Sequence, residues 1–296
     1  MSHERVTAVR MPLALLATAL VLATCVLPAA QRRTQTVTGM VVEVKPSEQL
    51  LVVSHDPIPG VMPAMIMSFD VRDASGLRGV PPGAIVSFTL RMDSEKAYAD
   101  DLRVIRYQSV EQDPLTVRRL RLLRSASAPS RLDLNEAVPD FALTNQAHRR
   151  VALSQFAGKV VAANFIYTSC ALPQFCYRMT NHFGVLQNRF ADATGRDLVL
   201  LSITFDPARD TPERLAEYAS QWKADPARWH FLTGSTKEIA RVAAMFGLDY
   251  FPDEGLINHS VRPVIIDRGG RLVANVEGNR FTAQQLGDLV ETVLAR

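Results

Sequence analysis

The sequence predicts two folded domains, a small all-β barrel or sandwich followed by an α/β domain with a mixed sheet. Its length of 296 residues fits about two domains of ordinary size. Strand-like segments separated by turns fill residues 35–107, and strand-like and helix-like segments alternate from residue 135. Hydrophobic residues make up 47% and charged residues 21%, which allows packed cores and excludes global disorder. The net charge of +3, without a long basic stripe, gives no reason to expect a nucleic-acid partner.

Residues 1–30 have the pattern of an export segment. Two arginines precede an uncharged apolar run, residues 11–30, which ends in small residues as a secretory signal does. At about 1.5 Å per residue this run is also about 30 Å long, enough for an uncleaved membrane anchor. Cys25 adds a lipidation site as a third alternative. Each alternative predicts that the rest of the chain is exported, to the periplasm or the outer face of the cytoplasmic membrane, and the last two predict a tether to that membrane.

Residues 35–107 contain five short segments rich in Val, Ile and Phe, separated by turn-forming residues. The segments are "TVTGMVVEV", "LLVVS", "MSFDV", "IVSFTLRM" and "LRVIRY". They predict a five-stranded barrel or sandwich. Residues 108–134 are expected to be a linker, because a basic amphipathic stretch, "LTVRRLRLLR", is followed by "SASAPSR". The basic stretch predicts either a solvated connector helix or a contact with an anionic membrane surface.

Residues 135–296 predict a mixed sheet with helices on both faces. The expected order is a hairpin, "DFALTNQAHRRVALSQF", then three strand–helix pairs that begin with "KVVAANFIYT", "LVLLSITFD" and "WHFLTG". A second hairpin turns at "RGG", and a closing helix, "TAQQLGDLVETVL", is expected to be capped by Thr282.

Cys170 and Cys176 are the only cysteines outside the export segment, with five residues between them. They follow a buried strand and precede a helix, a position that favours a thiolate and in which thioredoxin-like folds carry redox cysteines. In an oxidising compartment the two can form a structural disulfide or a redox pair, and they can also wrap both sulfurs around one metal ion. Spacing alone leaves these alternatives open.

The motifs "NFIYTSC", "FDPARDTPERL" and "GLINHSVRPVIIDRGGRLV" resemble the SCO/SenC family of copper-handling proteins with a thioredoxin-like fold, over residues 135–296. Members carry two cysteines after a strand, an Asp-Pro…Asp-Thr-Pro loop and a distant histidine. The resemblance implies a copper site and a redox pair, at Cys170 and Cys176 with His259, and places the acidic loop at Asp206 and Asp210. The chain departs from the family pattern, because three residues usually separate the cysteines and a proline follows each. Here Ala171 and Tyr177 replace those prolines.

Two thiolates and an imidazole suit Cu(I) and can also hold Cu(II), whereas zinc accepts the same donors. We expect His259 in a loop beside the cysteine turn. His182, in the helix after Cys176, is the second candidate ligand, and His148 and His230 are expected to be structural. The stretch "DTPERL" offers Asp210 or Thr211 as a helix cap before Pro212, and we expect the cap to be Asp210. The role of Asp206 is left open between capping and tuning the thiols.

A second candidate site lies in "SHDPIPGVMPAMIMSFDV", at His55, Met62, Met65 and Met67. Met65 and Met67 point to one face of a strand, where paired methionines are usually core filler. With His55 they form a soft donor set for Cu(I). The stretch resembles the CusF family motif His…Trp-Pro-Ala-Met-Thr-Met. That resemblance implies a five-stranded OB-like barrel that binds Cu(I) through His55, Met65 and Met67, with Met62 replacing the tryptophan and available as a fourth ligand.

Together these patterns predict an exported, membrane-tethered copper chaperone. Reduced thiols hold copper, and oxidised thiols form a disulfide. By resemblance the client is a copper site of a cytochrome c oxidase subunit, or another copper-accepting protein, supplied by an upstream copper donor. Two rival functions remain: a thiol–disulfide oxidoreductase acting on client cysteines, and a copper-sequestering resistance protein. No phosphate loop or hydrolytic motif is present in the sequence.

Overall fold

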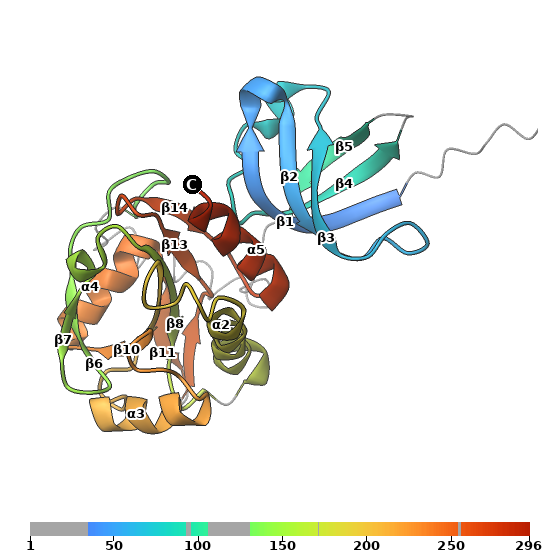
Figure 1. Cartoon of the computed structure of the whole chain (residues 1–296). Coiled ribbons are helices and arrows are strands. Elements are labelled where there is room, and N and C mark those ends of the chain that lie inside the picture. Colours follow the sequence, from blue (N-terminus) through green and yellow to red (C-terminus); the bar gives the residue numbers. More distant parts are fainter. Residues whose placement is uncertain (1–34, 93–95, 106–130, 171, 254–255) are drawn as a thin grey trace, which may run out of the picture. The chain divides into compact units, whose positions relative to one another are not determined.

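The computed structural model describes residues 35–92, 96–105, 131–170, 172–253 and 256–296 (Figure 1). The expected export segment and the basic stretch of the expected linker lie outside these residues. Thr34–Arg296 forms one compact unit. No helix among the described residues is long and apolar enough to cross a membrane.

The first domain is a closed barrel with the strand order β1-β2-β3-β5-β4, which confirms the predicted barrel. Its core comes from apolar residues that alternate along the strands and face inward, as small barrels require. The fifth strand begins at Ala97 rather than at Leu102, because the small side chains of Ala97 and Ala99 are buried. The elements are β1 (Gln35–Lys45), the 3-10 helix η1 (Pro46–Glu48), β2 (Leu50–His55), β3 (Met65–Asp70), the 3-10 helix η2 (Ala74–Leu77), β4 (Ile85–Met92) and β5 (Ala97–Val104).

The second domain contains a seven-stranded mixed sheet with the order β14-β13-β8-β9-β10-β6-β7. The strands β8, β9 and β10 are parallel, and the others pair antiparallel. The strands are β6 (Ala142–Asn145), β7 (Arg150–Ala152), β8 (Val160–Ile166), β9 (Leu198–Thr204), β10 (Trp229–Thr233), β13 (Val264–Ile266) and β14 (Leu272–Asn275). The helices are η3 (Leu153–Phe156), η4 (Pro173–Tyr177), α2 (Arg178–Arg189), α3 (Pro212–Gln221), α4 (Thr236–Phe246) and α5 (Ala283–Leu294).

Helices cover both faces of this sheet, as predicted. Every residue of β8 and β9 is buried, which suits a central parallel pair covered on both sides. Helices α2 and α5 contact each other on one face, and α4 lies on the other, with Phe246 packed on Phe165 of β8 (Figure 1). Thr282 caps α5 as predicted, in a reciprocal capping box with Gln285.

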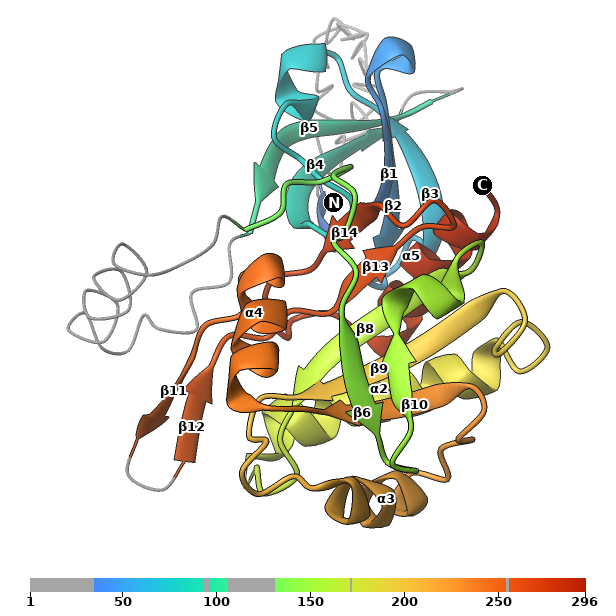
Figure 2. The same cartoon turned by 90° about the vertical axis from the view of Figure 1, so that its left-hand side faces the viewer.

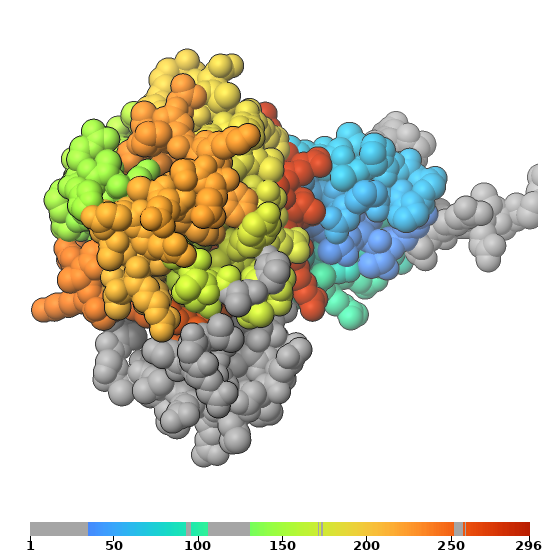
Figure 3. Space-filling view, turned by 90° about the horizontal axis from the view of Figure 1, so that it is seen from below, coloured from blue at the N-terminus to red at the C-terminus, as the bar shows by residue number. Residues whose placement is uncertain are grey.

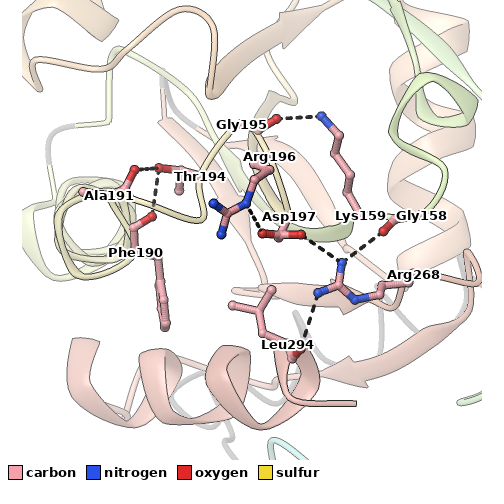
Figure 4. A network of polar contacts seen from close by, with 10 residues as sticks. All are labelled: Gly158, Lys159, Phe190, Ala191, Thr194, Gly195, Arg196, Asp197, Arg268 and Leu294. Carbon is pink, nitrogen blue, oxygen red and sulfur yellow. Dashed lines mark hydrogen bonds and ion pairs between the residues drawn. The ribbon is translucent and has the colours of Figure 1, made fainter.

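The chain segments that enter β8 and β9 are braced by polar contacts (Figure 4). Arg268 donates to the carbonyl oxygens of Gly158 and Leu294 and pairs with Asp197, which lies just before β9. Lys159, just before β8, donates to the carbonyl oxygen of Gly195. Because the strands are parallel, this brace holds their amino ends and leaves their carboxyl ends free to carry a site.

A short hairpin, β11 (Tyr250–Asp253) and β12 (Leu256–His259), was not predicted. Among the described strands, these two pair only with each other, and they lie away from the seven-stranded sheet (Figure 2). Pro252 and Gly255 made this stretch look like a loop, since both residues are depleted in strands. The expectation that His259 lies in a loop was therefore wrong: it is the last residue of β12.

Candidate metal centre

Cys170, Cys176 and His259 form a compact cluster of metal-binding side chains. Their ligand atoms all lie within 4.8 Å of one another. Cys176 Sγ is 3.7 Å from His259 Nε2. The fold brings the three side chains together from two separate parts of the second domain. The candidate ligands of the sequence motif are thus neighbours in space.

The two cysteines are placed by the carboxyl end of β8 and by the turn that starts α2. Cys170 is half-buried in the turn after β8, and Cys176 is buried within η4, a π-helical turn that runs directly into α2. The wide π-helical turn accommodates the five intervening residues while still returning Cys176 to Cys170. Such turns are uncommon and frequently occur at functional sites.

The imidazole of His259 presents a lone pair to the thiols. Its Nδ1 lies 2.9 Å from the carbonyl oxygen of Ser260, so Nδ1 carries the proton and donates. In the tautomer that this bond selects, the other ring nitrogen, Nε2, faces Cys176 and can offer its lone pair. This is the arrangement in which a histidine binds a metal with its orientation fixed by a backbone carbonyl.

Aromatic rings surround His259. Phe205 lies 4.7 Å from it between ring centroids, and Phe175 and Tyr167 approach at 5.8 and 5.9 Å with their rings near perpendicular to it. Burial raises the pKa of the Tyr167 hydroxyl, so that group stays protonated. These rings shield one side of the cluster from water and limit the imidazole to one orientation.

The two thiols differ strongly in acidity. The hydrogen bond from the Cys176 thiol lowers the pKa of Cys170 well below that of an ordinary thiol. The same bond, together with burial, raises the pKa of Cys176. Both cysteines are free thiols. At neutral pH the pair therefore carries one negative charge, held on the more exposed sulfur.

Asp210 supports the cysteine turn, and the expectation that it caps α3 was wrong. The cap is Thr211, whose hydroxyl accepts from the Arg214 amide. The buried Asp210 carboxylate instead accepts from the amide and hydroxyl of Thr168, at 3.1 and 2.6 Å, and from the hydroxyl of Thr204. It therefore joins the end of β9 to the residue two positions before Cys170. Asp206 is buried and pairs with Arg209 at 3.4 Å.

The other histidines of this domain lie outside the cluster. His182 is buried on α2 against Phe281, at 5.4 Å, and burial lowers its pKa to about 4. His230 stacks on Phe156, and the Nε2 of His148 lies 2.8 Å from a carboxylate oxygen of Glu213 in an exposed contact. None of the three belongs to the group of potential ligands found among the described residues.

The barrel places His55 directly opposite Met65 in the β2–β3 ladder, with Met67 opposite Val53 on the same face. His55 is 1% exposed, and its Nδ1 donates to the carbonyl oxygen of Asp56 at 2.7 Å. Its Nε2 is buried and has no hydrogen-bond partner among the described residues. A buried imidazole nitrogen with a free lone pair, beside two thioethers, is suited to a soft metal ion.

The thioethers differ in access to solvent. Met65 is 44% exposed, whereas Met62 and Met67 are partly buried against the barrel core. Met62 is held by a β-bridge with Ile58, so the turn before β3 returns it to the end of the barrel that carries His55. An exposed methionine on a strand next to a buried histidine argues against simple core filler.

Gly39 allows β1 to approach the His55 backbone. It pairs with His55 across the β1–β2 ladder, and a Cβ there would lie 2.6 Å from the carbonyl oxygen of Ser54 and 2.7 Å from His55 Cα. Only glycine fits this position without a shift of the strand that carries the histidine.

Several residues that shape the sites were not predicted. Phe205 and Tyr167 lie in apolar runs whose pattern indicates core packing, and Phe175 lies between the two cysteines; none of these positions carries a signal for a contact with His259. The contact between Asp210 and Thr168 joins segments 42 residues apart. Gln285 was recognisable only as part of a helix cap, although its side chain also reaches the barrel.

Two family models match the chain. Residues 130–295 match the SCO1/SenC family model, and residues 34–101 match the model of the copper binding periplasmic protein CusF. A SCO1 protein homolog of Bacillus subtilis is 35% identical over 111 residues, which are 37% of this chain and 56% of the relative. The chain thus spans little more than half the length of that relative.

Two solved structures are similar to more than half of the chain. The first is BsSco, which is 27% identical, with a TM-score of 0.48. BsSco is described as a member of the Sco family of cytochrome c oxidase assembly proteins in which a disulfide switch was identified. The match covers 56% of this chain and 97% of BsSco. Arabidopsis thaliana ScoI with copper bound is 25% identical, with a TM-score of 0.48, covering 54% of this chain and all of ScoI.

Proposed function

Because the chain belongs to the SCO1/SenC family, we propose that it is an exported copper chaperone with two copper sites. The first site consists of Cys170, Cys176 and His259. The observation that carries the proposal is the convergence of two thiols and a free imidazole nitrogen within 4.8 Å. This donor set is soft enough for Cu(I) and basic enough to hold Cu(II).

The side chains of the first site are prepared for a metal before it arrives. Cys170 already carries the thiolate, His259 already presents Nε2, and Cys176 has only to lose one proton. Binding therefore releases a proton, and affinity should rise with pH. Copper is the cargo here, and the half-buried Cys170 is the ligand that a donor or client would reach first.

The second site is proposed at His55, Met65 and Met67, with Met62 as a fourth ligand. Its support is the buried, unpartnered Nε2 of His55 opposite Met65, together with the match to the CusF model. Uncharged thioethers stabilise Cu(I) and bind Cu(II) or Zn(II) weakly. We expect thiolates to hold Cu(I) more tightly, so copper should move from the barrel to the cysteine site.

The proposed client is a copper site of a cytochrome c oxidase subunit, and the support is that BsSco is a member of a family of cytochrome c oxidase assembly proteins. The proposed location is the periplasm or the outer face of the cytoplasmic membrane. The support is the sequence of residues 1–30 and the periplasmic CusF match. A lipid or helical tether at the N-terminus would keep the chain near a membrane-bound client.

The test of the first site is Cu(II) binding to the reduced full chain, followed by absorption spectroscopy. Thiolate ligands give an intense sulfur-to-copper charge-transfer band that nitrogen and oxygen ligands do not. We expect this band in the wild-type chain, its loss in Cys170→Ser and in Cys176→Ser, and a shifted band with weaker binding in His259→Ala. His148→Ala, which removes an exposed histidine, is the matched control and should leave the band unchanged. An unchanged band in either cysteine variant would contradict the proposal.

A second candidate function is thiol–disulfide exchange with client cysteines. The observation that favours it is the unequal acidity of the two free thiols, which resembles an attacking and a resolving cysteine. Copper-free protein should then reduce a model disulfide at a rate that depends on Cys170. Rapid reduction without stable copper binding would favour this function over the chaperone. Stable copper binding with no transfer to any acceptor would favour copper sequestration.

A further inference from the structure

The end of β2 that carries His55 contacts the closing helix of the second domain. Gln285 Nε2, on α5, donates to the carbonyl oxygen of Ser54 at 3.2 Å and to Asp56 Oδ1 at 3.1 Å. Both residues that flank His55 are therefore held by one amide group. The contacts lie within the single compact unit Thr34–Arg296, and α5, in red, is bordered by blue barrel atoms (Figure 3).

This contact is buried and its polar groups are paired. Ser54 donates its hydroxyl proton to Asp288 at 2.6 Å, and Asp288 also accepts from Arg189 of α2 at 2.6 Å. Ser54, Gln285 and Asp288 are each no more than 4% exposed. Because a buried polar group without a partner is costly, such a fully paired cluster favours one defined arrangement.

Apolar packing accompanies the hydrogen bonds. Met40, Val42 and Ile85 of the barrel belong to the same core cluster as the second domain. Gly83 has a φ of +86°, and a Cβ there would lie 2.8 Å from Val276 Cγ2. Close backbone approach of this kind marks a fitted interface between the barrel and the second domain.

The same interface reaches the candidate ligand His55 through Asp56. The carbonyl oxygen of Asp56 accepts the Nδ1 proton of His55, which fixes the tautomer and leaves Nε2 as the metal-binding nitrogen. The carboxylate of Asp56 accepts a hydrogen bond from Gln285. The orientation of the imidazole thus depends on a residue whose own position depends on α5.

The side-chain amide of Gln285 forms two separate sets of hydrogen bonds, one through its oxygen and one through its nitrogen. Its Oε1 accepts from the Thr282 amide and completes the helix cap, at 2.9 Å. Its Nε2 carries two protons, and both have acceptors on the barrel, Ser54 and Asp56. A helix cap alone requires only the acceptor oxygen, which glutamate supplies equally well. The amide nitrogen therefore has a separate function.

We propose that Gln285 of the second domain is a positioning residue for His55, so that the barrel site reaches its full Cu(I) affinity only while docked on α5. This inference rests on the barrel copper site proposed above. Residues that orient a metal-binding histidine typically affect metal affinity by about 10- to 100-fold. Gln285 acts through Asp56, so an effect of about tenfold is expected.

The test measures Cu(I) affinity in the full chain carrying Cys170→Ser and Cys176→Ser, which leaves only the barrel site. In this background Gln285→Glu keeps the cap acceptor but replaces both donor protons with a carboxylate facing Asp56. We expect the Cu(I) dissociation constant to rise about tenfold. Gln285→Met, which removes the donors without adding a charge, provides the same test if the glutamate variant does not fold.

Thr282→Ala is the matched control, because it breaks the cap from the other side and leaves the amide protons of Gln285 on the barrel. Its Cu(I) affinity should stay within about twofold of the background, a change of less than half a kcal/mol. As a readout independent of copper, the NMR signal of the His55 Nδ1 proton in the copper-free chain should shift or broaden in the Gln285 variants and stay unchanged in Thr282→Ala.

The outcomes separate this inference from the proposed function. If Met65→Leu with Met67→Leu leaves Cu(I) binding unchanged, the barrel copper site itself is wrong. If those variants lose Cu(I) while Gln285→Glu and Gln285→Met bind normally, the site stands and the positioning role of Gln285 is overturned. An equal loss in Thr282→Ala would show that the helix cap, rather than the contact with the barrel, is responsible.

Discussion

Cys176 Sγ and His259 Nε2 lie 3.7 Å apart although 83 residues separate them in the sequence. The cysteine enters from the π-helical turn before α2, and the histidine enters from the end of the β11–β12 hairpin. These two elements are distant from each other in the sequence, and both bring a donor atom next to Cys170. Their convergence therefore argues for a shared metal ion more strongly than the cysteine pair alone does.

Thiol labelling should distinguish the two cysteines. In copper-free, reduced protein at about pH 6, iodoacetamide should modify Cys170 at least about tenfold faster than Cys176, because Cys170 has the lowered pKa and the greater exposure. Peptide mass spectrometry of timed samples measures both rates. Equal labelling rates of the two thiols would refute the charge distribution described here.

Asp210→Asn should destabilise the second domain by about 1–3 kcal/mol, because an amide nitrogen replaces one of the oxygens that accept from Thr168 and Thr204. Urea unfolding measures this change. The variant should also speed the labelling of Cys176, because the turn that covers it loses its anchor. Thr211→Ala, which removes the actual cap of α3, should cost about 1 kcal/mol without changing the labelling rate. Identical behaviour of the two variants would restore a capping role for Asp210.

His182 should make stability depend on pH. Burial lowers its folded-state pKa from 6.5 to about 4, so the unfolded chain binds the proton more readily than the folded chain does. The contribution of the neutral His182 to the free energy of unfolding is therefore fully present above about pH 6.5 and is lost as pH falls toward about 4. His182→Gln should flatten the stability profile in that window by about 2 kcal/mol relative to wild type. Parallel profiles for the two proteins, measured by urea unfolding, would contradict the burial argument.

Met65→Leu with Met67→Leu should leave the barrel folded and remove its Cu(I) site. The substitutions are nearly isosteric, so the free energy of unfolding should change by less than about 1.5 kcal/mol for each. Circular dichroism and urea unfolding measure the first effect, and competition with a Cu(I) chelator measures the second. Met92→Leu, which changes an exposed methionine at the end of β4, is the matched control and should bind Cu(I) normally. Full Cu(I) affinity in the double variant would show that both methionines serve only in packing.

Much of the fold follows from local patterns, because the strands and helices here obey strong periodicities. The buried runs of β8 and β9 and the capping signal at Thr282 have direct physical meanings in the sequence. The β11–β12 hairpin has no such signal in the sequence, since its pairing is short and includes Pro252.

The candidate sites were predictable only as far as their donor atoms. Cysteine, histidine and methionine reveal a soft donor set, but the contacts that support them come from segments distant in sequence. Asp210 was assigned to a cap because its neighbours favour a helix start, whereas a tertiary contact with Thr168 determines its role. The role of Gln285 was equally hidden in the sequence, because a capping box gives no sign of its contact with Ser54, which lies 231 positions earlier in the chain.

The most direct test of two copper sites in one chain is a count of bound copper. Four forms of the reduced full chain would be loaded anaerobically with Cu(I), desalted and analysed for metal: wild type, Cys170→Ser with Cys176→Ser, Met65→Leu with Met67→Leu, and all four substitutions together. We expect about two, one, one and no copper ions per chain, because each pair of sulfur ligands belongs to a separate site. A wild-type chain that holds one copper ion, lost in the cysteine variant and kept in the methionine variant, would contradict it.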